Sequence, residues 1–566
     1  MKNFNSDPDI LAGEIKVASA QLNPTVGDLA GNAAMAREAR AEAAALGADL
    51  IVFSELFISG YPPEDLVLKP AFVTAAQREI EALAAETGYG GPAMLIGTPW
   101  PGKSKSGKPF NAVALLDGGK VQALRFKTDL PNYGVFDEKR VFAQGPMPGP
   151  VNFRGVRLGV PICEDIWTPD VCECLAETGA EILISPNGSP WTLTKRGVRM
   201  NQAVARVTET GLPLIYVNQV GGQDELVFDG ASFALNPGGA LAHQAPALES
   251  VLSLVTLRRG ADGWRAEPGE RALVEEGDEA AYRACVLGLR DYVEKNGFKG
   301  VLMGLSGGVD SALCAAMAVD ALGADRVHCL MLPYRYTSTE SLLDAAACAE
   351  ALGVRYDIAP IYPPVEGFTA ALAPLFAGRE PDIAEENLQS RTRGALLMAV
   401  SNKFGAMLVT TGNKSEVSVG YSTLYGDMNG GFNPIKDLYK TQVFALCHLR
   451  NRLRPRGCLG PEGVVIPETI ITKPPTAELR ENQKDQDSLP PYDVLDHILR
   501  GLVDEEASVK DIVACGHDGA TVRKVERLLY LAEYKRRQSA PGVKITDRNF
   551  GRDRRYPITN KFRETF

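Results

Sequence analysis

The segment Gly304-Leu305-Ser306-Gly307-Gly308-Val309-Asp310-Ser311 combines glycines, hydroxyls and one carboxylate. An apolar run at 301–303 precedes it and an alanine-rich helical pattern at 312–322 follows, so we expect a loop between a buried strand and a helix N-terminus. Free backbone N–H groups and the positive end of the helix dipole bind phosphate at such a loop. Asp310 would repel an uncompensated phosphate, so we predict a bridging Mg²⁺ ion. The lysine of a Walker loop is absent.

A second group of reactive side chains lies in the first half of the chain. Glu55, Lys127 and Cys163 each follow an apolar, strand-like run. A cysteine attacks as its thiolate, which a neighbouring lysine cation favours, while a carboxylate can take and return the proton. The five histidines of the chain include none near Cys163 in sequence. The three residues therefore predict nucleophilic catalysis, although singly they could be a core thiol and a surface ion pair.

Strand-like and helical patterns alternate around these side chains. A strand-like run at 15–20, an amphipathic helix at 32–46 and a buried strand at 49–53 predict a sheet with helices packed against it. Further strand-like runs lie at 93–97, 112–116, 121–126, 156–162, 182–185, 214–217 and 232–235. Glu55 is thus expected just past a strand, where its charge would face a cleft.

The second half of the chain has a different pattern. Residues 258–279 contain few apolar residues and are predicted to be a linker. After it, helices at 280–295 and 341–352 alternate with strands at 300–305, 327–332 and 355–358. This alternation predicts a doubly wound parallel sheet, in which ligands bind beyond the carboxyl ends of the strands. The Ser306 loop falls at that edge.

The composition bounds the kind of protein. The 566 residues are 45% hydrophobic and 23% charged, with a net charge of −10. This length predicts two large domains, and the charge argues against a general nucleic-acid-binding surface. Because the N-terminus is polar and no long apolar run occurs, we predict a cytoplasmic protein without a membrane span or signal peptide. The ten cysteines read as reduced thiols, and Cys172 and Cys174 lack the partners of a zinc site.

Three blocks of the first half resemble the nitrilase (carbon–nitrogen hydrolase) family over residues 14–257. They are Ser54-Glu55-Leu56 with Gly60-Tyr61-Pro62, Lys127 to Tyr133 with Phe136 to Arg140, and Cys163-Glu164-Asp165-Ile166-Trp167. The resemblance implies an α-β-β-α sandwich and an amidase. In it Glu55 would be the general base, Lys127 would stabilise the oxyanion and Cys163 would form a thioester.

The same resemblance implies further site residues. Glu138 matches a second active-site glutamate of the family, and Tyr133, Ser189 and Lys195 match glutamine contacts. Taken alone, the segment 186–190 around Ser189 could equally be a simple turn between prolines.

The Ser306 loop resembles the S-G-G-x-D-S pyrophosphate loop of ATP pyrophosphatases, and residues 280–566 resemble the NAD⁺ synthetases. The resemblance implies ATP contacts at Gly304 to Ser311, Thr411, Lys440 and Thr476. It implies Mg²⁺ ligands at Asp310 and Glu416, and deamido-NAD⁺ contacts at Asn387, Glu416 and Lys535. Leu424 departs from the lysine that many ammonia-dependent members carry. Asn387 could instead cap a helix, and Lys535 could be a solvated charge.

The pairing of these two halves resembles the glutamine-dependent NAD⁺ synthetases. It implies an α/β enzyme of two domains, 14–257 and 280–566, that hydrolyses L-glutamine and amidates deamido-NAD⁺ through an adenylate, giving NAD⁺, glutamate, AMP and pyrophosphate. Ammonia is mostly protonated at neutral pH, so we expect it to pass between the sites through an internal tunnel. The resemblance also implies a homo-oligomer, at least a dimer.

Two alternatives stay open at this stage. Other amidotransferases use the same ATP loop for GMP synthesis, asparagine synthesis or tRNA thiolation. The first two usually carry other glutaminase folds, and tRNA modification favours a more basic surface. A non-catalytic scaffold has no physical need of Glu55, Lys127, Cys163 and Asp310.

Overall fold

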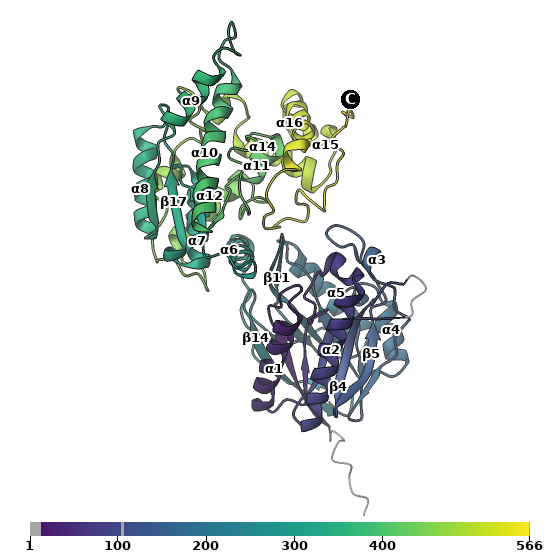
Figure 1. The fold of residues 1–566 in the computed structure, drawn as a ribbon. Helices are drawn as coiled ribbons and strands as arrows, with labels where there is room; N and C mark the ends of the chain where they lie inside the picture. The colour runs from purple at the N-terminus through teal and green to yellow at the C-terminus, as the bar shows by residue number, and fades with distance from the viewer. Residues whose placement is uncertain (1–12, 103–106, 565–566) are drawn as a thin grey trace, which may run out of the picture. The chain divides into compact units, whose positions relative to one another are not determined.

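The structure, a computed structural model, describes residues 13–102 and 107–564. The chain divides into two compact units, Met1–Gln223 with Val227–Glu275 and Asp224–Leu226 with Glu276–Phe566 (Figure 1). Each unit has its own sheet structure, and the two are described separately. In the described part of the chain, we find no helix with the length and apolar character of a membrane span.

Two mixed sheets form the first unit. In spatial order, the strands described in the larger sheet are β15 (Gly263–Ala266), β14 (Val251–Gly260), β1 (Glu14–Gln21), β2 (Leu50–Val52), β3 (Ala93–Trp100), β4 (Phe110–Asp117) and β5 (Lys120–Phe126). Those of the smaller sheet are β13 (Leu241–Gln244), β12 (Phe233–Leu235), β9 (Leu214–Asn218), β8 (Ile182–Asn187), β7 (Val156–Gly159) and β6 (Val151–Phe153). A short hairpin joins β10 (Val220–Gln223) to β11 (Leu226–Asp229).

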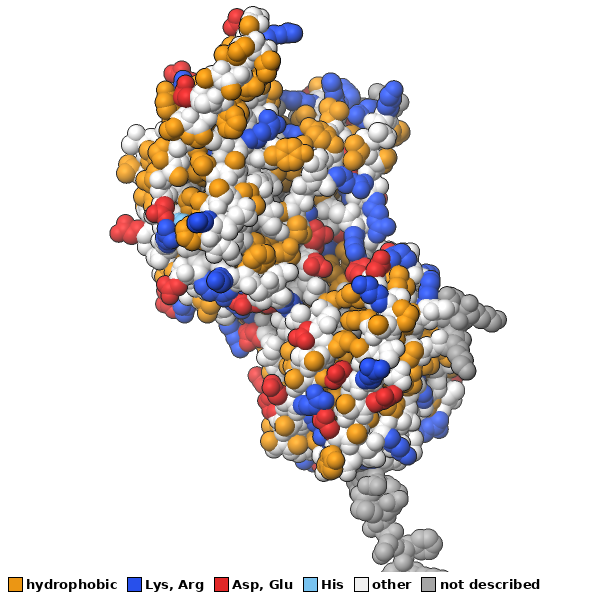
Figure 2. All heavy atoms as spheres, viewed as in Figure 1, with side chains coloured by type: hydrophobic (Ala, Val, Ile, Leu, Met, Phe, Trp, Pro, Cys, Tyr) orange, Lys and Arg blue, Asp and Glu red, His pale blue; other side chains and the backbone are white. Residues whose placement is uncertain are grey.

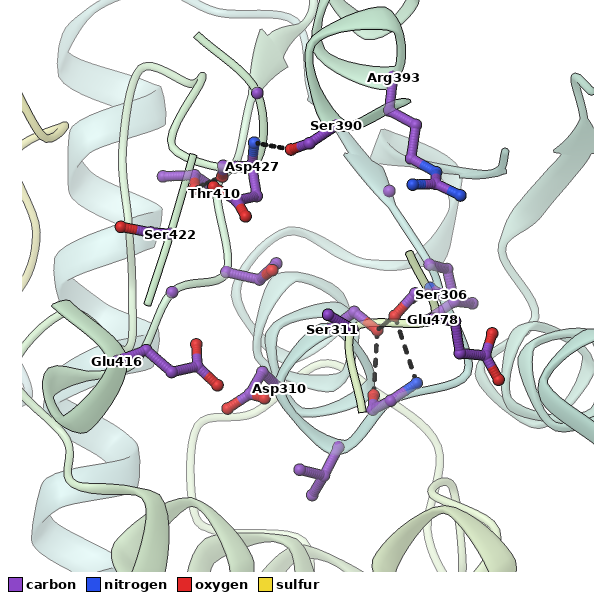
Figure 3. Close-up of a pocket in the computed structure, with 18 of the residues that line it drawn as sticks. Ser306, Asp310, Ser311, Ser390, Arg393, Thr410, Glu416, Ser422, Asp427 and Glu478 are labelled. Carbon is purple, nitrogen blue, oxygen red and sulfur yellow. Dashed lines mark hydrogen bonds between the residues drawn. The ribbon is translucent and has the colours of Figure 1, made fainter. Parts of the chain in front are cut away.

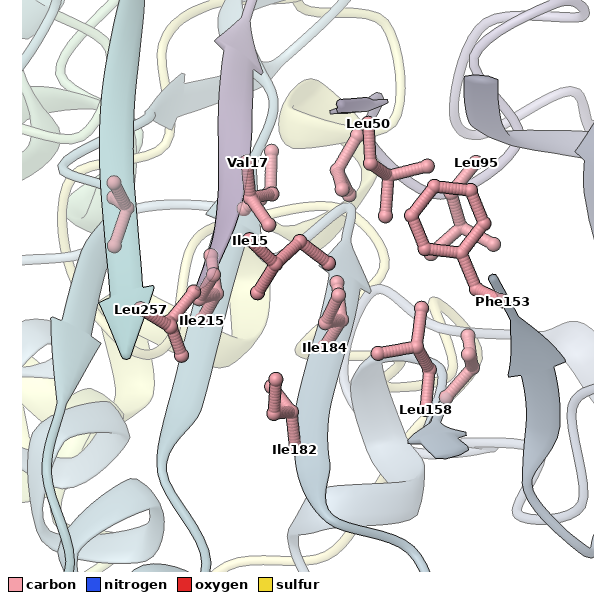
Figure 4. Close-up of a cluster of buried hydrophobic side chains, with 14 of the residues drawn as sticks. Ile15, Val17, Leu50, Leu95, Phe153, Leu158, Ile182, Ile184, Ile215 and Leu257 are labelled. Atoms are coloured by element: carbon pink, nitrogen blue, oxygen red, sulfur yellow. The ribbon is translucent and has the colours of Figure 1, made fainter. Parts of the chain in front are cut away.

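The core of the first unit lies between these sheets. Ile15 and Val17 of β1 meet Ile182 and Ile184 of β8 in one buried cluster (Figure 4). Because side chains alternate along a strand, Ala18 of β1 points the other way. The alternation visible in the sequence therefore places two apolar layers on the same sheet.

Helices cover the outer faces of both sheets. On the larger sheet, alanines of α1 (Leu29–Ala45) and Ile80 of α2 (Pro70–Glu86) pack with the outward side chains of β1 to β3. On the smaller sheet, α4 (Asp170–Glu177) and α5 (Lys195–Thr210) pack with Leu183 and Tyr216. A short helix, α3 (Glu138–Val141), follows β5. The predicted α-β-β-α sandwich is confirmed.

The second unit contains a parallel sheet, as predicted. Its described strands run in the order β18 (Arg355–Ile358), β17 (Val327–Met331), β16 (Val301–Gly304) and β19 (Met407–Leu408), and every pair is parallel. The helices are α6 (Gly277–Lys295), α7 (Val309–Leu322), α8 (Thr339–Leu352), α9 (Tyr362–Leu372), α10 (Ile383–Phe404), α11 (Lys414–Val419), α12 (Lys440–Arg452), α13 (Glu468–Thr472), α14 (Tyr492–Leu499), α15 (Val509–Ala514), α16 (Gly519–Leu531) and α17 (Glu533–Arg536).

Local sequence signals explain where the helices near the sheet begin and end. Asp382 caps α10 and Glu385 returns the hydrogen bond in a capping box, while Gly405 ends the helix in a left-handed conformation. Leucines of α10 pack on Leu302 and Leu408 of the sheet. The helix α7 contacts β16 and β17 and begins directly after the glycine-rich loop.

The predicted linker at 258–279 differs from the observed structure. Its first part is the end of β14 and the whole of β15, which pair antiparallel from Leu257 to Ala266. Trp264 and Ala266 are buried in the sandwich core, while Arg265 between them is exposed. This strand-like alternation was missed in the sequence because it lies in a segment rich in charged residues. The helix α6 then starts at Gly277. The domain limits 14–257 and 280–566 stay a prediction.

Candidate active sites

The three predicted catalytic residues of the first unit follow strands of both sheets. Glu55 comes shortly after β2, Lys127 directly after β5, and Cys163 begins a short 3₁₀ helix, η3 (Cys163–Ile166), after β7. All three are buried. Lys127 Nζ donates a hydrogen bond of 2.7 Å to Glu55 Oε1 and another of 2.8 Å to Glu138 Oε1. One ammonium thus joins both predicted glutamates.

The charges of this cluster depend on one another. Burial by itself would lower the pKa of Lys127, but the carboxylates of Glu138 and Glu55 outweigh it and raise the pKa well above its usual value. Burial raises the pKa of Glu138 to about 7, against the opposing effect of Lys127. The two glutamates therefore favour the charged form of Lys127, while burial favours the neutral form of Glu138.

Three further groups orient the glutamates. Tyr61 Oη donates to Glu138 Oε1 at 2.7 Å, and Asn111 Nδ2 donates to Glu55 Oε1 at 2.7 Å. The backbone N–H of Gly188 donates to Glu55 Oε2 at 3.0 Å. Glu55 therefore accepts three hydrogen bonds, an arrangement that fixes its carboxylate.

Cys163 has an unusual backbone and an unreactive resting state. Its φ of 46° lies in the left-handed region, which a non-glycine residue seldom occupies. Burial and the charge of Glu55 raise the pKa of its thiol well above the usual value, although Lys127 and the Gly188 N–H oppose them. Burial and Glu55 therefore favour the neutral thiol in the free site, and attack on a carbonyl then requires a base.

The three predicted glutamine contacts each make a different interaction in the structure. Tyr133 Oη donates to Glu164 Oε1 at 2.9 Å, and Lys195 Nζ stands 3.9 Å from the centre of the Trp167 ring. The backbone N–H of Ser189 donates to Asn218 Oδ1 at 2.9 Å. Glu164 was missed as a candidate, although its position next to Cys163 was a signal for it.

The glycine-rich loop of the second unit lines a cavity of about 320 Å³ (Figure 3). Within the loop, Ser306 N–H and Oγ contact Ser311 Oγ at 3.2 and 3.1 Å, and Gly308 N–H donates to Ser306 Oγ at 3.3 Å. Gly307 has a φ of 77°, and a Cβ there would stand 2.3 Å from Ser341 O. Only glycine fits this position.

The other predicted ATP contacts, Thr411, Lys440 and Thr476, line the same cavity. The predicted deamido-NAD⁺ contacts Asn387 and Lys535 lie outside its lining. Asn387 Oδ1 accepts a hydrogen bond of 2.9 Å from Thr423 Oγ1, and Asp382, not Asn387, caps α10. Lys535 Nζ donates to the carbonyls of Gly420 and Ser422 at 2.7 and 2.6 Å. Both side chains therefore hold segment 420–427, part of which lines the cavity.

The predicted Mg²⁺ ligands also meet in this cavity. Lys440 Nζ donates to Asp310 Oδ2 at 2.5 Å and to Glu416 Oε1 at 3.1 Å. Burial raises the pKa of Glu416, and the charge of Lys440 opposes that rise. An ammonium between two carboxylates marks a position suited to a cation, and such oxygens are ligands that Mg²⁺ takes together with phosphate. No group of three or more metal-ligating side chains occurs in residues 13–102 and 107–564.

Arg393 was not among the predicted site residues. It lines the cavity from α10 (Figure 3). Its Nε donates to Leu332 O at 3.0 Å, at the end of β17. Burial lowers the pKa of its guanidinium to about 10, which leaves it charged at neutral pH. Ser390, three residues earlier on the same helix face, lines the same cavity.

The fold and the two sites define a carbon–nitrogen hydrolase unit joined to a nucleotide-dependent synthase unit. A model of the carbon–nitrogen hydrolase family matches residues 16–265, and a model of the NAD synthase family matches residues 281–539. The glutamine-dependent NAD(+) synthetase of Rhodobacter capsulatus is 54% identical over 98% of this chain and 100% of its own length. That of Thermotoga maritima is 42% identical over 97% of this chain and 99% of its own length.

A solved structure agrees over the same length. The glutamine-dependent NAD⁺ synthetase from Acinetobacter baumannii, in complex with adenosine diphosphate, is 43% identical, covers 97% of this chain and 99% of its own, and has a TM-score of 0.76. The chain belongs to the glutamine-dependent NAD(+) synthetases. These ATP-using enzymes amidate deamido-NAD⁺ to NAD⁺ with nitrogen from glutamine.

Proposed function

We propose that the two sites catalyse different steps of the reaction of this family, and we assign each step to particular residues. Glu55, Lys127 and Cys163 release ammonia from glutamine, and the cavity behind the Ser306 loop forms the amide of NAD⁺ with ATP. The observation that carries the proposal is the buried Lys127 ammonium held by Glu55 and Glu138 beside Cys163. A buried cation between two glutamates can stabilise an oxyanion that forms beside it during the reaction.

The amidase step begins with a neutral thiol. Glu55 takes the proton of Cys163 as the sulfur attacks the amide carbon, and the Lys127 ammonium stabilises the oxyanion. Glu55 then gives the proton to the leaving nitrogen, and ammonia departs as the thioester forms. A water molecule, deprotonated by Glu55, hydrolyses the thioester to glutamate and returns the proton to the sulfur. Glu138 and Tyr61 hold the position of the Lys127 ammonium throughout.

Selection of glutamine follows from the charges near Cys163. We assign the α-ammonium of glutamine to Glu164, whose carboxylate already accepts from Tyr133, and the α-carboxylate to Lys195. Ser189 contributes from a loop that Asn218 fixes. A substrate with both charges matches this pair, whereas a simple amide lacks them.

In the second unit, the loop N–H groups from Gly304 to Ser311 bind the β and γ phosphates of ATP, aided by Lys440, Thr411 and Thr476. Asp310 and Glu416 hold Mg²⁺, which when bound neutralises the departing pyrophosphate. The nicotinate carboxylate attacks the α phosphorus and expels pyrophosphate, and ammonia then attacks the acyl-adenylate and expels AMP. Arg393 adds a fixed positive charge to this cavity.

The contacts to deamido-NAD⁺ are assigned to Asn387, Glu416 and Lys535. Glu416 lines the cavity, and the other two contact segment 420–427, which includes the lining residues Ser422 and Asp427. We therefore place this substrate along that segment, with Asn387 and Lys535 at its border.

We also propose a cytoplasmic homo-oligomer, at least a dimer. Large apolar side chains are exposed on α9 and on the residues from there to the start of α10, where Phe368 is 49%, Leu375 77% and Ile383 67% exposed (Figure 2). Apolar surface of this kind supports a contact with a second copy.

The test measures NAD⁺ formation from deamido-NAD⁺, ATP and Mg²⁺, with glutamine or ammonium as the nitrogen source. Cys163→Ala should lose the glutamine-dependent reaction and keep the ammonium-dependent one. If Cys163→Ala keeps both reactions, the amidase assignment is wrong. If Asp310→Asn keeps the ammonium-dependent reaction at the wild-type rate, the assignment of the second site is wrong.

A further inference from the structure

Asp165 is a buried carboxylate that the amidase mechanism above does not use. It lies two residues after Cys163 in η3, and its side chain is almost fully buried, with 1% of the residue exposed. A buried carboxylate destabilises the fold unless hydrogen bonds compensate its lost hydration.

Three backbone N–H groups donate hydrogen bonds to the Asp165 carboxylate. Its Oδ1 accepts from Thr128 at 3.0 Å and from Asp129 at 2.7 Å, and its Oδ2 accepts from Ile162 at 2.9 Å. Thr128 directly follows Lys127, and Ile162 directly precedes Cys163. One side chain therefore holds the main chain on both sides of the predicted catalytic pair.

The two held segments come from different sheets. Lys127 directly follows β5 of the larger sheet, and Cys163 follows β7 of the smaller sheet. The sheets meet through apolar side chains, which fix a separation less sharply than directional hydrogen bonds do. The Asp165 carboxylate supplies such bonds at the point where the Lys127 and Cys163 loops meet.

Building on the proposed function, we propose that Asp165 is a positioning residue that sets the distance between the Lys127 ammonium and the Cys163 sulfur. Its role is to keep the oxyanion-stabilising cation in place relative to the nucleophile, without contact to the substrate. The charged form suits this role, because both oxygens of a carboxylate accept hydrogen bonds. An amide would instead place an NH₂ group against one of the N–H donors.

The ionic surroundings of Asp165 agree with this role. Burial raises the pKa of Asp165 to about 7, while the N–H groups of Asp129 and Ile162 and the charge of Lys127 lower it and the charge of Asp129 raises it. Cys172 also lies within its electrostatic reach. The N–H groups of Asp129 and Ile162 thus favour the charged form of Asp165 and oppose the effect of burial.

The experiment compares full-length wild type, Asp165→Asn and Asp165→Glu. Glutaminase kcat and KM are measured and divided by the number of active sites, counted by complete labelling of Cys163 with a glutamine-analogue electrophile. Asp117→Asn is the matched control, because Asp117 pairs with Arg154 at the opposite end of β5 from Lys127. Ammonium-dependent NAD⁺ synthesis serves as an internal control for the second unit.

We expect kcat per labelled site to fall about 10- to 100-fold in Asp165→Asn, with KM for glutamine within about twofold of wild type. Asp165→Glu keeps the charge but shifts the oxygens by one methylene, so its kcat per site should also fall. Asp117→Asn should match the wild type, and ammonium-dependent synthesis should not change in any variant.

The outcomes separate this inference from the proposed function. Wild-type kcat per labelled site in Asp165→Asn or in Asp165→Glu overturns the positioning role, since lost folding alone lowers the number of sites and not the rate at each. If Cys163→Ala keeps glutamine-dependent synthesis, the proposed function fails instead, whatever Asp165 does.

Discussion

Replacing Lys127 with methionine should destabilise the first unit strongly. Lys127 makes two charge-assisted hydrogen bonds, of 2.7 Å to Glu55 and 2.8 Å to Glu138, and all three side chains are buried. Removing one partner of a buried ion pair costs about 3–5 kcal/mol, because the remaining charges are left without compensation. For a unit of this size, that cost corresponds to a fall in the midpoint of thermal unfolding of about 5–10 °C.

The loss should depend on pH in a defined direction. Glu138 has a pKa raised to about 7 even beside Lys127, and losing the ammonium raises the pKa further. A carboxyl with a raised folded-state pKa favours folding at low pH, where it is neutral, and this advantage is lost as pH rises through that pKa. Lys127→Met should therefore be destabilised less at pH 5 than at pH 8.

The assay is differential scanning calorimetry of the full chain at both pH values, following the transition that ATP does not shift. Lys120→Met is the matched control, since Lys120 is an exposed lysine at the start of the same strand. The double variant Lys127→Met with Glu138→Gln removes one of the two stranded charges and should recover part of the loss at pH 8. An equal shift at pH 5 and pH 8, or no recovery in the double variant, would refute the electrostatic reasoning.

Two further predictions concern single side chains. Glu164→Gln removes the charge assigned to the α-ammonium, so KM for glutamine should rise at least about tenfold with a smaller change in kcat, measured as glutaminase activity; an unchanged KM contradicts the assignment. Gly307→Ala places a Cβ 2.3 Å from Ser341 O at a φ of 77°, so we expect ATP affinity, measured by calorimetric titration, to fall by at least about tenfold while glutaminase activity persists. Wild-type ATP affinity in Gly307→Ala would show that the loop does not hold the phosphates.

Most of the fold could be predicted because buried strands and helices have a regular spacing of apolar residues in the sequence. The alternation of Ile15, Val17 and Ala18 separates the two faces of β1, and the apolar runs before the Ser306 loop mark a parallel strand. The strand β15 was missed because only Trp264 and Ala266 face the core and charged residues surround them. Its pairing with β14 is a tertiary contact that no local pattern encodes.

The site could be predicted in part for a similar reason. Glu55, Lys127 and Cys163 follow strands in recognisable blocks, and the structure brings the first two into direct contact. Asn111 and Asp165 were missed because Glu55 lies 56 residues from Asn111, and Thr128 lies 37 residues from Asp165. An isolated Asn or Asp also has many uses. Hydrogen bonds between positions that are far apart in the sequence leave no regular spacing that a sequence pattern could reveal.

The neutral thiol of Cys163 has a consequence for the lifetime of the enzyme in the cell. Peroxides and alkylating agents react with the thiolate, and susceptibility follows thiolate character and exposure. Cys163 is 4% exposed, and its pKa is held well above the usual value by burial and by Glu55. A nucleophile that is buried and favoured in its protonated form between turnovers is a poor target for such reagents.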